Sequence, residues 1–145
     1  ISHVDRQQLP ENLTFMPKGL SGKNEILRFH KPSLQGIGSL SALNLNPSDQ
    51  YFDLPVITVS TVLEEFGLGN KEIDYLKFDI EGSEHSVVEN ILEEGIRPKQ
   101  IAFELDQPVP PWTMENTIRK LMTNGYELSK VWGLNVHLLR SDCIR

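Results

Sequence analysis

The sequence predicts a single α/β domain with a sheet that is parallel in its middle and antiparallel at its C-terminal end. An apolar strand pattern over residues 73–80 leads directly into a helical pattern. A second strand and a second helix follow it, and this alternation is typical of parallel strands. Two further strand patterns lie on either side of Gly133, and so short a connection predicts an antiparallel hairpin.

The composition is that of an ordinary globular domain. The 145 residues are 39% apolar and 23% charged, with a net charge of −6 and no cluster of Lys or Arg. We therefore expect no direct contact with nucleic acid, which needs a basic surface. Cys143 is the single cysteine, so no internal disulfide forms, and no apolar run reaches the roughly 18 residues that span a bilayer. We expect a reducing, aqueous compartment, the cytoplasm, and no membrane partner.

The first third of the chain has short and irregular patterns. Residues 13–16 and 25–30 predict two short strands, as a hairpin or as a strand with an extension. Residues 32–53 have no sustained period and predict a long surface loop. The loop contains Gly36-Ile37-Gly38-Ser39, but no third glycine, preceding strand or clear following helix. It is therefore interpreted as a flexible loop and not as a phosphate-binding turn.

The remaining elements follow in regular order. Residues 56–59 predict a strand, and Ser60 or Thr61 is expected to cap a helix with Glu64 or Glu65 completing the capping box. The later patterns predict a helix over residues 85–94, a strand over 100–105, a helix over about 114–123 capped by Thr113, and strands over 126–132 and 135–139.

The strand over residues 73–80 is the centre of the prediction. Its apolar residues are nearly continuous, which favours burial on both faces in the middle of the sheet. Asp79 and Glu81 come at its carboxyl end, and Gly82 allows the tight turn into the helix. Ligands of open α/β sheets bind at this edge. An acid at the end of a buried strand is costly without a partner or a task, so Asp79 is a candidate functional residue.

The residues alone leave the chemistry of these acids open. Asp79, Glu81 and Glu84 are suited to orienting a donor molecule, to general-base catalysis or to binding a divalent metal. Glu84 and Glu89 are interpreted as negative charges that favour a helix N-terminus. His30, His85 and His137 show no ligand spacing, so no metal site is predicted from them.

One block of the sequence resembles a known family. The block is Asp74-Tyr75-Leu76-Lys77-Phe78-Asp79-Ile80-Glu81-Gly82-Ser83-Glu84, and a helix and then Ile101-Ala102-Phe103-Glu104 follow it. It resembles the central block of FkbM-type methyltransferases, which has the pattern hydrophobic-Lys-hydrophobic-Asp-hydrophobic-Glu-Gly-small-Glu. Residues 15–22, 38–40 and 56–63 resemble the middle region of the same family in order and spacing. The likeness covers roughly residues 9–140.

The resemblance implies a fold, a cofactor and a site. It implies the C-terminal portion of a Rossmann-like class I methyltransferase fold, using S-adenosylmethionine to methylate a hydroxyl of a sugar or other small metabolite. Asp79 and Glu81 would face the donor's methyl group and the acceptor, and the backbone of Gly19 and Leu20 would lie near the adenine. The family's first strand, glycine-rich loop and second strand have no counterpart in residues 1–145. We therefore expect one N-terminally incomplete domain that holds the donor poorly by itself.

Two other functions stay open at this point. One is a non-catalytic α/β interaction domain derived from a methyltransferase, and the other is a metal-dependent hydrolase that uses Asp79 and Glu81. An incomplete sheet would also leave an unpaired edge along residues 73–80, which predicts possible self-association.

Overall fold

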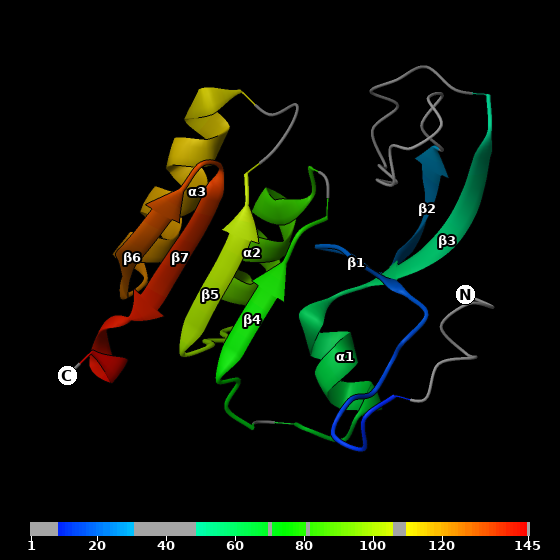
Figure 1. The fold of residues 1–145 in the computed structure, drawn as a ribbon, viewed down its shortest axis with the longest axis horizontal. Helices are drawn as coiled ribbons and strands as arrows, with labels where there is room; N and C mark the ends of the chain where they lie inside the picture. Colours follow the sequence, from blue (N-terminus) through cyan, green and yellow to red (C-terminus); the bar gives the residue numbers. More distant parts are fainter. Residues whose placement is uncertain (1–8, 31–48, 70, 81, 106–109, 145) are drawn as a thin grey trace.

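The computed structural model describes residues 9–30, 49–69, 71–80, 82–105 and 110–144. These described residues form two sheets and three α-helices (Figure 1). The strands are β1 (Gly19–Leu20), β2 (Glu25–His30), β3 (Tyr51–Ile57), β4 (Tyr75–Phe78), β5 (Gln100–Glu104), β6 (Tyr126–Trp132) and β7 (Asn135–Arg140). The helices are α1 (Val59–Glu65), α2 (Glu84–Glu93) and α3 (Pro111–Thr123), and a short 3-10 helix, η2 (Ser141–Cys143), follows β7.

The larger sheet has the order β4-β5-β7-β6. β4 and β5 are parallel, β5 and β7 are antiparallel, and β6 and β7 form the predicted C-terminal hairpin. The predictions of a mixed α/β sheet and of this hairpin are therefore confirmed.

The two faces of this sheet have different surroundings. Cross-strand rows of apolar side chains lie on the face that α2 and α3 cover in Figure 1. These side chains are Leu76, Phe78, Ile101, Phe103, Val136 and Leu138. The alternate residues Tyr75 and Lys77 are exposed, Tyr75 by 51%. No helix among the described residues covers their face.

The prediction that β4 is buried on both faces is therefore wrong for this chain. Its length and its parallel pairing with β5 agree with the sequence pattern, but β4 is an edge strand among the described residues. Burial on both faces needs a neighbour on each side and a layer above and below. The apolar run shows what the strand can bury, whereas the described residues supply one neighbouring strand and one covered face.

The smaller sheet has the order β1-β3-β2 and differs most from the predictions. Residues 13–16 form no strand, and β2 pairs with β3 and not with them. β3 begins at Tyr51, within the stretch predicted as a loop, because Phe52, Leu54 and Val56 alternate with more exposed residues. The nucleotide-loop candidate at residues 36–39 lies outside the described residues, as does Leu40.

The helix boundaries also differ in detail. Thr58 is the N-cap of α1, and its side-chain oxygen accepts a hydrogen bond from the Thr61 N–H at 3.3 Å, so the predicted cap at Ser60 or Thr61 is two or three residues too late. α3 begins at Pro111 and not near Met114, because proline fits the first helical position, where no N–H is needed.

An ion-pair network lies at the amino ends of β4 and β5. The Lys99 Nζ lies 2.7 Å from Asp74 Oδ1 and 3.0 Å from Glu72 Oε2. Arg140 pairs with Glu72 at 2.6 Å and donates a hydrogen bond to the Arg97 carbonyl. The Arg140 guanidinium, followed by Lys99, lowers the pKa of Glu72. The network holds the segment before β4 against β5 and β7 at the end of the sheet opposite Asp79.

Because Tyr126 is buried, we expect the stability of the protein to depend on pH. Its buried hydroxyl donates to the Pro98 carbonyl at 2.8 Å, and burial raises the pKa of Tyr126 to about 12. An unfolded tyrosine ionises near pH ~10, so the folded protein holds this proton more tightly. The associated stability is complete below pH ~10 and is lost as the pH rises toward about 12. Urea unfolding across this range should show the decline, and Tyr126→Phe should flatten it. If the free energy of unfolding depends on pH equally in the two proteins, the effect does not come from Tyr126.

Candidate active site at the carboxyl edge of the sheet

The acids at the carboxyl ends of β4 and β5 lie at one level of the sheet. Phe78 and Phe103 are paired in the parallel register, and their rings stack with centroids 5.3 Å apart. Asp79 and Glu104 each come one residue later, so both lie at the carboxyl edge, where parallel strands present ligand-binding groups. Asp106 and Glu81 lie outside the described residues. The described part of the edge therefore brings together Asp79 and Glu104.

The exposure of Asp79 differs from the sequence prediction. The side chain was expected to close a buried strand, but Asp79 is exposed. It continues the alternation of Tyr75 and Lys77, which lie on the uncovered face. No burial cost therefore demands a partner for Asp79. Its place in the candidate site rests on its position at the strand end.

Gly82 has the unusual backbone conformation that the sequence predicts. Its φ is +107°, a value that residues with a Cβ rarely adopt, and the residue is buried. This conformation turns the chain from β4 into α2, which begins two residues later at Glu84. The prediction of a strained turn at Gly82 is confirmed.

The sequence interpretation missed the role of Glu84. The predicted place of Glu84 in the first turn of a helix agrees with the structure, but only 3% of the residue is exposed. Its Oε1 accepts a hydrogen bond from the Ile80 N–H and its Oε2 accepts one from the Gly82 N–H, each at 2.9 Å. The signal in the sequence is an acid two residues after a turn glycine, where the side chain can reach back to the turn.

Gly19 and Leu20 form the short strand β1. They pair with Val56 and Ile57 of β3, and Leu20 packs against the core. A Cβ on Gly19 would lie 2.8 Å from Val56 Cγ1, so only glycine fits the present packing. The structure places Gly19 and Leu20 in a strand beside the core. Their predicted contact with an adenine stays a prediction.

The segment after β1 contacts α2 directly. A Cβ built on Gly22 would lie 2.5 Å from the carbonyl oxygen of Ser86 and 2.8 Å from its carbonyl carbon. The Ser21 N–H donates to the Ile57 carbonyl at 3.0 Å, so this segment is also bound to the end of β3. The close approach at Gly22 joins the smaller sheet to the helix that follows the candidate acids.

Gly22→Ala should therefore destabilise the protein by about 1–3 kcal/mol, because the added methyl group meets backbone that cannot rotate away. Denaturant unfolding measures the change. Lys23→Ala in the same turn is the control, since it adds no atom near Ser86. An unchanged free energy of unfolding in Gly22→Ala would show that the two elements are not in close contact.

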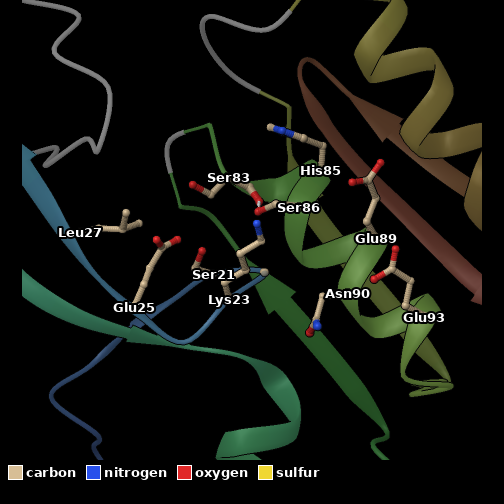
Figure 2. Close-up of a pocket in the computed structure, with 11 residues that line it drawn as sticks. Ser21, Lys23, Glu25, Leu27, Ser83, His85, Ser86, Glu89, Asn90 and Glu93 are labelled. Carbon is tan, nitrogen blue, oxygen red and sulfur yellow. Dashed lines mark hydrogen bonds between the residues drawn. The ribbon is translucent and has the colours of Figure 1, made fainter.

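A polar groove lies between this segment and α2. Its volume is about 520 Å³, and it is lined by Ser21, Gly22, Lys23, Glu25, Leu27, Ser83, His85, Ser86, Glu89, Asn90 and Glu93. Figure 2 shows Glu25 and Leu27 on the β2 side and Ser83, Ser86 and Asn90 on the α2 side. Hydroxyl, carboxylate, amine and imidazole groups from two elements thus face one space. Such a lining suits a ligand with several hydroxyl groups.

Two other features bear on function in the described part of the chain, namely clustered metal ligands and membrane-spanning helices. No three His, Cys, Asp or Glu side chains there are grouped so that they could hold a metal ion. None of the helices described is long and apolar enough to cross a membrane.

Comparison with known proteins decides the family. The sequence model of the methyltransferase FkbM domain matches residues 10–128. The chain belongs to this family. The match covers both sheets up to the start of the C-terminal hairpin, and it includes Gly19, Leu20 and Asp79. No curated protein and no solved structure matches the chain significantly. In this FkbM domain, Asp79 and the residues that line the groove lie within the matched part of the chain.

Proposed function

We propose that this FkbM domain is part of an S-adenosylmethionine-dependent methyltransferase that methylates a hydroxyl group of a sugar or another small metabolite. The family match carries the proposal. The position of Asp79 at the carboxyl edge of the parallel strands supports it, because ligands of such sheets bind there.

The residues present fit the proposed donor in their chemistry. Asp79 and Glu104 supply carboxylates at the edge, and carboxylates accept hydrogen bonds from ribose hydroxyls and attract cationic groups. In the proposal Gly19 and Leu20 lie beside the adenine, and Asp79 and Glu81 lie toward the methyl group and the acceptor. S-adenosylmethionine, when bound, supplies a methyl group on a positively charged sulfur.

Asp79 acts as the general base in this proposal. Its carboxylate accepts the proton of the acceptor hydroxyl as the new bond from oxygen to the methyl carbon forms and the bond from carbon to sulfur breaks. Exposure leaves the carboxylate open to the acceptor. The groove beside α2 holds the rest of the acceptor, since its serine, glutamate and asparagine side chains can bind hydroxyl groups.

We also propose that the larger sheet is completed by further polypeptide. Among the described residues β4 has one neighbouring strand, and the face with Tyr75 and Lys77 has no covering layer. Strands that pair in parallel are ordinarily covered on both faces. A longer chain is the proposed source, and a second copy pairing along β4 is the other. Sedimentation of residues 1–145 tests this, because a stable, non-aggregating monomer would contradict both.

The function is tested with the complete protein in two steps. Calorimetry should show binding of S-adenosylhomocysteine, the product of the donor. A panel of hydroxylated acceptors, with matched deoxy and amino analogues, should show methyl transfer only where the hydroxyl is present. Binding without any transfer across the panel would favour a non-catalytic domain, and absence of binding would refute the proposed cofactor.

A further inference from the structure

The turn between β4 and α2 is held by one buried carboxylate. Glu84 is the first residue of α2, and its two oxygens accept hydrogen bonds from the N–H groups of Ile80 and Gly82, each at 2.9 Å. β4 ends at Phe78, so neither N–H belongs to the strand ladder or to the helix. One side chain therefore satisfies two backbone donors that regular structure leaves without a partner.

The burial of Glu84 makes its hydrogen bonds to the turn energetically important. A buried carboxylate is costly unless hydrogen bonds compensate its lost hydration, and bonds to an ionised acceptor are stronger than neutral ones. Both oxygens point at the same short segment, which fixes the distance between Ile80 and Gly82 as well as their orientation. Gly82 supplies the positive φ that this geometry needs.

The residues held by Glu84 lie directly after the candidate acid Asp79. Ile80 follows Asp79 directly, and Ile80 and Gly82 flank position 81 in the sequence. We propose that Glu84 is a positioning residue, which holds Ile80 and Gly82 after β4 in one conformation so that Asp79 keeps its orientation toward the acceptor. The part of this proposal that concerns the acceptor rests on the proposed function.

Glu84→Gln in the complete protein is the test. Glutamine has nearly the same size, but its NH₂ group cannot accept a hydrogen bond, so one of the two bonds must be lost. We expect amide hydrogen exchange at Ile80 and Gly82 to become about tenfold faster or more, while Val88 and Ile91 within α2 exchange at the wild-type rate. We expect kcat to fall about tenfold with the KM for the donor unchanged, as for a group that acts on geometry and not on binding.

Two further variants keep the test decisive. Glu64→Gln, an exposed carboxylate on α1, should leave exchange and kcat at wild-type values. Glu84→Asp keeps the charge but is one methylene shorter, so it should also speed exchange at Ile80 or Gly82, and it replaces Glu84→Gln if that variant does not fold.

The outcomes separate this proposal from the proposed function. Unchanged exchange at Ile80 and Gly82 would overturn the proposal, and so would faster exchange with wild-type kcat. If the wild-type protein transfers no methyl group, the proposed function fails. The exchange measurement then decides by itself whether Glu84 holds the turn.

Discussion

Asp79→Ala is expected to abolish methyl transfer by the complete protein while leaving it folded. The side chain is exposed at the carboxyl edge of β4, so its removal takes away little packing. In the proposed mechanism, however, it removes the base that accepts the hydroxyl proton. Loss of a general base typically costs about 10²–10⁴-fold in rate. Steady-state turnover measures the loss, and circular dichroism with thermal unfolding checks the fold.

Two further variants sharpen the Asp79 test. Asp79→Asn keeps the shape and removes the charge, and it should be as inactive as Asp79→Ala if proton transfer is the task. Glu127→Ala, an exposed carboxylate on β6, should leave turnover unchanged. Near wild-type turnover in Asp79→Ala would show that the catalytic assignment is wrong.

Gly82→Val is expected to lower the free energy of unfolding by more than ~1 kcal/mol. The φ of +107° is unfavourable for any residue with a Cβ and most unfavourable for a β-branched one. The residue is also buried, so the valine side chain must displace neighbouring atoms. Denaturant unfolding at several urea concentrations measures the difference.

A second glycine separates the two causes. Gly95 also has a positive φ, +69°, but nothing lies within 4 Å of a Cβ built there. Gly95→Ala should therefore show the cost of the backbone conformation alone, and Gly82→Val should cost clearly more. A Gly82→Val protein as stable as wild type would remove the reason for glycine at the turn.

The sequence predicts the part of the fold in which hydrophobic period and turn residues agree. β4, α2, β5 and the C-terminal hairpin all have a clear period, and Gly82, Gly95 and Gly133 mark the turns between them, so their order along the chain and the pairing of the hairpin follow from the residues. The period of a strand does not reveal its neighbours. For this reason the exposure of Tyr75 and Lys77 was not predicted from an apolar run.

The candidate site, like the fold, is predicted only in part from the sequence. The position of Asp79 at a strand end follows from the sequence, because a strand followed by a helix fixes where the carboxyl edge lies. The part played by Glu84 depends on a side chain folding back over two residues, and helix periodicity contains no such information. The extent of β3 was missed for a third reason, since Pro55 and Asp53 weaken a strand pattern that pairing with β2 stabilises.

Transfer of an isotope-labelled methyl group from S-adenosylmethionine by the complete protein tests the central claim most directly. The account predicts that the label appears on an oxygen of a hydroxylated small molecule, with one S-adenosylhomocysteine formed for each methyl group transferred, and that Asp79→Ala forms both products at least about 100-fold more slowly. Label on nitrogen or carbon would contradict the proposed acceptor chemistry. Equal transfer by the Asp79→Ala protein would contradict the site itself.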